Sequence, residues 1–221
     1  LPVSILRSWF TGQIAALSPG CFALVMATGI ISNALFFEGR RELSDALFIA
    51  NLIAYPSLIL LTILRFVKFG WRLGADLINP SVVFSFFTIV AGTDVFGLGI
   101  SLRGFETIAS VLCLVALILW LVLIYFSFCV LTFLNKPQSR HVADVLHGGW
   151  LIAIVGTESL VLLGTVVAPA LGHFGPTVFV LSHMLWGGLG LHSTAFSSRY
   201  LPIESSSLTL NRTTLPRCCG L

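Results

Sequence analysis

Two acidic side chains of this sequence lie inside long apolar runs, where little water is available to solvate a carboxylate. Glu158 lies near the middle of the run at 148–168, and Asp94 lies in the outer third of the run at 79–100. A charged side chain at the centre of a bilayer costs at least ~2.5 kcal/mol on insertion scales, so it usually faces a partner or a water-filled cavity. Both acids are therefore candidates for handling a proton or an ion, with a simple neutral carboxyl group as the alternative.

Small and hydroxyl-bearing residues recur at helical spacing in the same runs. At about 100° per residue, each of three runs presents one such helix face. In the first run it comprises Phe22, Met26, Gly29 and Asn33, in the third Ser81, Ser85, Thr88 and Gly92, and in the fifth Ile154, Thr157, Glu158, Val161 and Thr165. Asp94 lies about 140° from the second face and is expected to pair elsewhere. Such faces suit a weakly polar passage, but Gly, Ser and Thr are also the residues with which helices pack closely in lipid. Spacing alone favours neither interpretation.

Other reactive residue types form no catalytic or metal-binding pattern. His183 lies within the run at 177–197, where a lone histidine is more often a hydrogen-bonded packing residue than a proton relay. The five cysteines include no CxxC pair and no pairing with histidine at ligand spacing, and no HExxH motif, nucleophile elbow or phosphate loop is present. We therefore expect no enzyme and no metal or cofactor site. A formal net charge of +3 also provides no basic tract for nucleic acid.

The elements that must position these residues are apolar helices. Of the 221 residues, 57% are hydrophobic and only 10% are charged, whereas a soluble domain carries about a quarter charged residues. About 20 mostly apolar residues cross a bilayer as a helix. Six runs meet that requirement: about 18–37, 44–66, 79–100, 105–133, 148–168 and 177–197. The sequence thus predicts an all-α, polytopic membrane protein with six transmembrane helices arranged as hairpins.

The distribution of Lys and Arg predicts the orientation of these spans. Nine of the twelve basic residues fall on one side, and only Arg40, Arg41 and Arg103 fall on the other. The positive-inside rule then places both termini in the cytoplasm of a multi-pass protein of the plasma or inner membrane. Residues 1–17 are expected to be a cytoplasmic segment without a cleavable signal peptide, 18–197 the transmembrane domain, and 198–221 a polar tail of disordered composition.

Odd and even runs differ in composition. The fourth run contains no Gly, Pro or charged residue over 112–133, and the second differs from it mainly by Asn51 and Pro56. The first, third and fifth runs instead carry several glycines, and two of them carry a proline. Gly and Pro are tolerated at membrane depth where neighbours or a water-filled cavity satisfy the loosened backbone. This alternation predicts that the even helices face lipid and that the odd helices surround a shared aqueous route.

Three stretches on the odd runs resemble one known family. The segment 19–29 (PGCFALVMATG) is similar to the first-helix signature of the tellurite-resistance/C4-dicarboxylate transporter family, which includes slow-type anion channels, malate permeases and sulfite efflux pumps. Asn79-Pro80 with the aromatic, Thr and Gly residues of 84–93 resembles its third-helix pattern. Residues 149–151 with Thr157 and Ser159-Leu160 resemble its fifth. The resemblance covers roughly residues 15–197.

The resemblance implies helical hairpins with an inner ring of odd helices around a pore and an outer ring of even helices, commonly as a homo-trimer. It implies a channel or secondary transporter for small anions such as malate, sulfite or chloride. The pore-lining candidates are Phe22, Met26, Gly29, Ser81, Ser85, Thr88, Gly92, Thr157, Glu158 and Thr165. A pore-facing Glu158 would have to be neutral or coupled to a proton for an anion to pass.

The sequence departs from the family in the number of spans. The family has ten and this chain has six, and the ninth helix, which carries the occluding phenylalanine, is among those absent. The tail after Ser197 suggests a truncated or frameshifted product. The alternative to an anion transporter is therefore a structural or inert membrane fragment that transports nothing.

Overall fold

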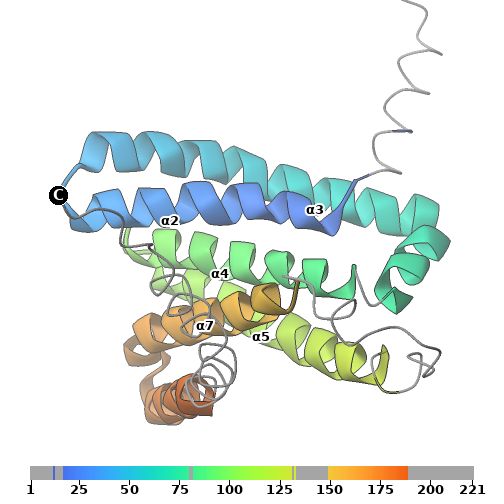
Figure 1. Cartoon of the computed structure of the whole chain (residues 1–221). Helices are drawn as coiled ribbons and strands as arrows, with labels where there is room; N and C mark the ends of the chain where they lie inside the picture. The colour runs from blue at the N-terminus through green and yellow to red at the C-terminus, as the bar shows by residue number, and fades with distance from the viewer. Residues whose placement is uncertain (1–11, 13–16, 80–81, 131, 133–148, 189–221) are drawn as a thin grey trace, which may run out of the picture.

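The computed structural model describes residues 12, 17–79, 82–130, 132 and 149–188 (Figure 1). These residues are helical, with turns between the helices and without a strand. The elements in chain order are η1 (Pro19–Phe22), α2 (Ala23–Phe37), α3 (Arg41–Ile78), η2 (Val83–Phe86), α4 (Phe87–Ser101), α5 (Glu106–Cys129), α7 (Gly149–Val167), η4 (Ala168–Phe174) and a last helical segment, 175–188. The all-α prediction is confirmed.

Five helical stretches of the described residues are long and apolar enough to cross a membrane: Pro19–Phe37, Arg41–Ile78, Val83–Ser101, Glu106–Cys129 and Leu151–Gly188. The last of these contains most of the predicted fifth span and the described part of the sixth, and η4 separates the two with a break at Gly172, where φ is 53°. The predicted sixth span is helical as far as residue 188. Its remainder and the tail at 198–221 lie outside the described residues, as does nearly all of the segment 1–17.

Two glycines close the turns of the helical hairpins. Gly39 connects α2 with α3 at φ 81°, and Gly104 connects α4 with α5 at φ 87°. A side chain with a Cβ rarely adopts this left-handed conformation, so glycine is the residue that permits so short a reversal. These turns make α2 and α3, and likewise α4 and α5, antiparallel neighbours.

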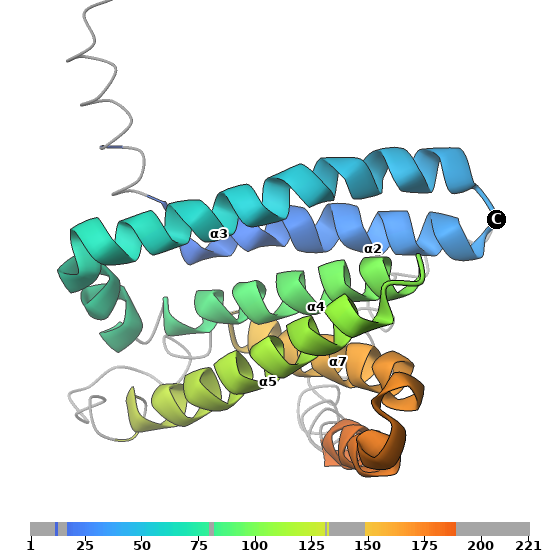
Figure 2. The same cartoon turned by 180° about the vertical axis from the view of Figure 1, so that it is seen from behind.

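Helix α3 is longer than the predicted span 44–66. Its 38 residues would extend about 57 Å if straight, well beyond the ~30 Å hydrocarbon core. The backbone leaves helical geometry at Phe69 (φ −132°, ψ 34°), and the end of the helix turns away from the main rod (Figure 2). Arg65 Nη2 donates to Asp76 Oδ2 at 2.6 Å across this bend. The ion pair thus holds the short terminal arm against the spanning part of α3.

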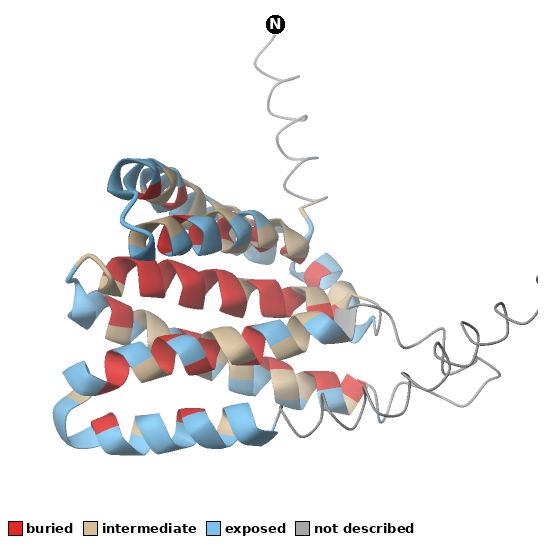
Figure 3. Ribbon diagram, turned by 60° about the vertical axis from the view of Figure 1, so that its left-hand side comes forward, coloured by how far each residue is buried: buried red, intermediate tan, exposed pale blue. Residues whose placement is uncertain are grey.

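Helix α4 lies at the centre of the described structure. Every residue from Val90 to Ile100 is buried, and Figure 3 shows α4 red along nearly its whole length. The α2–α3 hairpin covers one side, and α5 and α7 cover the other. Large apolar side chains are exposed along the outer faces of α3 and α5, among them Ile53, Leu60, Ile118 and Val122. Such faces mark contact with lipid or with another protein surface, and α2 carries one as well, at Leu24, Ile30 and Phe37.

Candidate functional site

The three odd spans are neighbours in the order α2, α4, α7. A Cβ placed on Gly92 of α4 would lie 3.4 Å from the Phe22 carbonyl oxygen, and one placed on Gly156 of α7 would lie 3.4 Å from Phe87. At Gly29 of α2 the approach of α4 is closer still. These small residues therefore let the backbones approach, which is the packing role that sequence alone could not separate from pore lining.

The beginnings of the first and third spans meet at one end of this row. Each span starts with a 3₁₀ turn, η1 before α2 and η2 before α4, and the two turns are in contact. Thr88 Oγ1 lies 2.8 Å from the Pro19 carbonyl oxygen and 2.6 Å from that of Ser85, and its hydroxyl is placed to donate to either. Thr88 is buried. Its contact with Pro19 thus joins the two 3₁₀ turns at this end of the bundle.

Asp94 is buried between α4 and α7. Ser159 Oγ donates to its Oδ2 at 3.1 Å, so the acid pairs away from the serine stripe, as its angular position predicted. Its Oδ1 has no hydrogen-bond partner in the described structure. Asp94 lies near the middle of α4, seven residues before Ser101, and its expected position in the outer third of the membrane span stays a prediction. The helix begins later than predicted, and that moves its midpoint toward Asp94.

Glu158 occupies a different environment from Asp94. It is half-buried near the middle of α7, and it lies on the stripe that includes the exposed Leu151, Val155, Leu162 and Val166. No hydrogen bond or ion pair within the described residues reaches its carboxylate. This stripe is the face of α7 that α4 and α5 leave uncovered, so Glu158 is the acid that a solute or a further helix can meet.

The predicted mixed face of the fifth span is divided in the structure. Thr157 and Val161 are buried, whereas Glu158 and Thr165 are half-buried. Trp120 Nε1 of α5 donates to Thr157 Oγ1 at 2.9 Å, and Thr157 Oγ1 donates to the Ala153 carbonyl at 2.9 Å. This contact was not predicted from the sequence. The available signal was Trp120 itself, because an indole N–H at membrane depth needs an acceptor, and the turns of the fourth span next to Trp120 carry only apolar side chains.

A polar network that sequence reasoning also missed joins α2, α3 and α4. Asn51 of α3 donates from Nδ2 to the Val25 carbonyl at 3.2 Å, and its Oδ1 accepts from Thr28 Oγ1 at 2.5 Å. Asn33 Nδ2 donates to the Val95 carbonyl at 3.1 Å. Asn51 stood out in an otherwise apolar run, and that isolation was the available signal.

The remaining candidates are more scattered. Phe22 is buried and packs edge-on against Tyr55, with ring centroids 6.4 Å apart, while Met26 and Ser85 are half-buried. Thr165 Oγ1 donates to the Leu162 carbonyl at 2.8 Å. Ser81 lies outside the described residues. Among the residues described, no group of three His, Cys, Asp or Glu side chains is placed to hold a metal ion.

Arg103 organises the end of the bundle opposite the 3₁₀ turns. Its guanidinium pairs with Asp45 at 2.6 Å, donates to the Gly99 carbonyl at 3.0 Å, and lies 3.8 Å from the centroid of the Phe48 ring. A shallow hollow of about 500 Å³ lies beside it, lined by Arg41 and Phe36 among others. Arg41 also stacks on Phe36, at 4.5 Å from the ring centroid. This end therefore holds Arg40, Arg41 and Arg103, the three arginines that the sequence pattern places on the opposite side from the other nine basic residues.

Comparison with known proteins identifies the family of this helical arrangement. The family model described as voltage-dependent anion channel matches residues 16–201. An uncharacterized transporter of Methanocaldococcus jannaschii is 28% identical over 176 residues, which cover 75% of this chain and 49% of that protein. The chain thus spans about half the length of that relative, and no solved structure matches significantly. The resemblance inferred from the odd-helix motifs is confirmed, and the chain belongs to the voltage-dependent anion channel family.

Proposed function

We propose that this chain contributes to a membrane channel or secondary transporter for small anions, with the uncovered face of α7 as part of the wall of the passage and with α4 and α2 packed behind α7. The observation that carries the proposal is the order of these helices. The three spans with glycines and polar side chains lie side by side, with α4 between α2 and α7. Three helices cannot enclose a pore. The passage in this proposal is completed by helices outside the described residues or by other subunits.

The ten candidates differ in how well their positions suit a lining role. Glu158 and Thr165 lie at the uncovered face of α7 and rank first, with the half-buried Met26 and Ser85 next. Thr88 and Thr157 already use their hydroxyls within the bundle. Phe22, Gly29 and Gly92 pack between helices, and Ser81 lies outside the described residues. We therefore place the solute beside Glu158 and Thr165 rather than beside Thr88 and Gly92.

An acid in this position sets a condition on anion movement. A carboxylate repels an anion at close range, so Glu158 must be protonated when the anion passes, either permanently or once in each cycle. Selectivity would then come from the diameter of the passage and from hydroxyl donors rather than from a fixed cation. Malate and related dicarboxylates, sulfite and chloride are the proposed solutes. A homo-trimer in the cell membrane with cytoplasmic termini is the proposed assembly.

Flux into proteoliposomes tests this proposal directly. We expect chloride, sulfite or malate uptake above that of empty vesicles, and a Glu158→Gln variant should move anions with a flatter pH profile. Glu42→Gln is the matched control, because Glu42 lies at the exposed first turn of α3. An unchanged pH profile in Glu158→Gln, alongside measurable parent flux, would refute the role of Glu158 in proton coupling but not the transport itself.

Cysteine labelling tests the assignment of faces. Single cysteines at positions 158 and 165 should react with a water-soluble maleimide faster than one at Leu119, which lies on α5. Equal and slow reaction at all three positions would remove the aqueous route from α7.

The second candidate function is a membrane fragment that transports nothing. It is favoured by the use of Gly29, Gly92 and Gly156 for close packing between helices. A folded, reconstituted protein that conducts none of the three anions at any pH between 5 and 8 would support it.

A further inference from the structure

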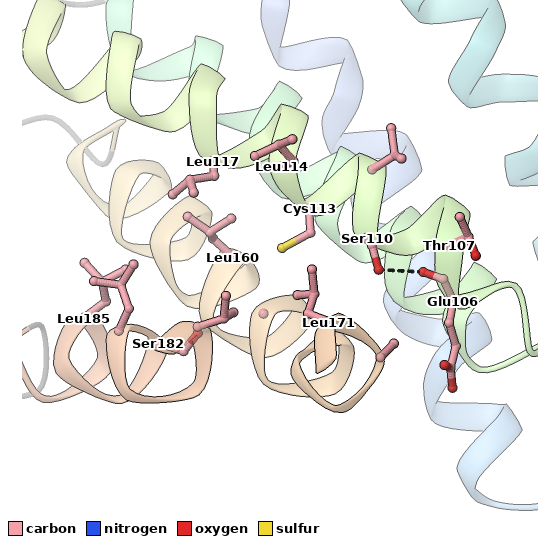
Figure 4. Close-up of a pocket in the computed structure, with 15 residues that line it drawn as sticks. Glu106, Thr107, Ser110, Cys113, Leu114, Leu117, Leu160, Leu171, Ser182 and Leu185 are labelled. Carbon is pink, nitrogen blue, oxygen red and sulfur yellow. Dashed lines mark hydrogen bonds between the residues drawn. The ribbon is translucent and has the colours of Figure 1, made fainter. Parts of the chain in front are cut away.

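A groove of about 610 Å³ lies between α5, α7 and the helical segment 175–188 (Figure 4). One wall is the face of α5 from Glu106 to Leu117, and the facing wall is formed by the segment 175–188. Leu160 and Gly164 of α7 form the floor. The volume falls within the ~300–1,000 Å³ typical of small-molecule sites.

The lining of this groove changes from polar at one end to apolar along its length. Glu106, Thr107 and Ser110 lie together at the start of α5, and leucines surround the other end (Figure 4). Ser110 Oγ donates to the Glu106 carbonyl oxygen at 2.8 Å, so this hydroxyl is already used within the helix. The groove therefore has the polarity of an amphiphile, with one charged rim and a long apolar body.

The charge at the rim is not neutralised by its nearest basic neighbour in the chain. Arg103 precedes Glu106 by three residues, but its guanidinium pairs with Asp45 at 2.6 Å and with the Gly99 carbonyl. In the described part of the chain, no hydrogen bond or ion pair involves the Glu106 carboxylate. An unpaired carboxylate at the end of an apolar groove complements a ligand with an ammonium group and disfavours a ligand with net negative charge.

The length of the groove matches one leaflet of a bilayer. Leu117 follows Glu106 by eleven positions, and at 1.5 Å per residue the two lie about 16.5 Å apart along α5. That distance is roughly half of the ~30 Å hydrocarbon core. Cys113 lies between the two ends, and its sulfur points into the groove (Figure 4).

We propose that this groove binds one acyl chain of a zwitterionic aminophospholipid of the phosphatidylethanolamine class. The ammonium of the headgroup lies beside the Glu106 carboxylate, and the acyl chain runs past Cys113 toward Leu117. The site is separate from the uncovered face of α7 and does not depend on the proposed transport function.

Photo-crosslinking of the purified chain in detergent micelles tests the proposal. Phosphatidylethanolamine or phosphatidylglycerol is added, each with a diazirine at the middle of one acyl chain, and labelled residues are mapped by mass spectrometry. We expect label at Cys113, Leu160 and Leu171, with the ethanolamine lipid favoured by about two- to fivefold, as for one partly exposed ion pair. Label spread evenly over the outer faces of α3 and α5, or equal labelling by the two lipids, overturns the proposal.

Two pairs of variants separate the headgroup from the groove. Glu106→Gln should equalise the two lipids, whereas Glu42→Gln, at the first turn of α3, should not. Cys113→Phe should abolish the label in the groove, whereas Val115→Phe, at an exposed position of the same helix, should preserve it. The map of the parent protein decides the matter if a variant fails to fold. A photoreactive side chain in place of Leu114 tests the alternative of a subunit contact. If it crosslinks to a second copy of the chain instead of to lipid, the groove is a contact between subunits and lipid binding is refuted.

Discussion

Gly29→Ala is expected to destabilise the protein even though alanine is the better helix former. A Cβ at this position of α2 would lie 2.6 Å from Val95 Cγ1 and 3.0 Å from Asn51 Nδ2. Carbon atoms pack at about 3.5–4.0 Å, so Val95 would have to retreat by roughly 1 Å. A valine on a helix has one strongly preferred rotamer, so α4 itself must move away from α2.

The magnitude follows from two opposing effects. Overpacking of a tight contact costs about 1–3 kcal/mol, and replacing glycine by alanine inside a helix returns up to about 1 kcal/mol. Displacement of Asn51 also weakens its bond to the Val25 carbonyl, which is worth about 0.6 kcal/mol at membrane depth. We expect a net loss of about 1–2 kcal/mol. Gly74→Ala on α3 is the matched control, because nothing lies within 4 Å of its Cβ, and it should stabilise by up to about 1 kcal/mol.

Reversible unfolding in mixed micelles with increasing dodecyl sulfate measures both free energies. The double variant Gly29→Ala/Val95→Ala removes the atom that the new methyl group meets. It should therefore be more stable than the sum of the two single changes by at least about 1 kcal/mol. If Gly29→Ala stabilises the protein as much as Gly74→Ala does, or if its effect simply adds to that of Val95→Ala, then α2 and α4 are not packed through this contact.

Three further changes test contacts of the bundle. Asp94→Asn should shift the free energy of unfolding by less than about 1 kcal/mol in the same assay. The reason is that a carboxyl group buried without a cation partner in the described structure is best accommodated uncharged. A loss above about 3 kcal/mol would mean that an ionised partner exists. Trp120→Phe keeps an aromatic ring but loses the hydrogen bond to Thr157, so the free energy of unfolding should fall by about 0.6–1.7 kcal/mol. Thr157→Val in the same protein should cause no further loss, because the bond is already absent. Asp76→Asn removes the counter-charge of Arg65 and should lower the free energy of unfolding by about 1–2 kcal/mol. This loss is smaller than for a fully buried ion pair, because the Asp76 side chain is 31% exposed. In hydrogen exchange, the part of α3 after Phe69 should open first.

The sequence was sufficient to predict the helical fold because bilayer length and composition constrain it strongly. A run such as 105–133 has no stable alternative to a membrane-spanning helix, and α5 indeed occupies Glu106–Cys129. Helix ends were less certain. The extension of α3 past residue 66 depends on the Arg65–Asp76 pair, which holds a charged arm in place and which no hydropathy average contains.

The candidate site was harder to predict, because helical spacing gives the angle between residues but not the neighbour at each angle. Helical spacing puts Thr88 and Gly92 on one face of the third span. Only the structure shows that η1 meets this face through Pro19 and Phe22. Likewise, Trp120 and Asn51 carried visible polar groups, but their acceptors are 37 and 26 residues away in the chain. Contacts of that range depend on how the hairpins pack.

The two intramembrane acids show why burial decides the role of a charged group. Asp94 belongs to a helix with neighbours on every side, so its carboxyl can act only through contacts such as Ser159. Glu158 is adjacent in sequence to that serine but points to the face of α7 that the described helices leave uncovered. A proton exchanged with water or with a passing anion has to reach its acid. Proton coupling in this protein is therefore expected at Glu158, with Asp94 as a fixed polar contact between α4 and α7.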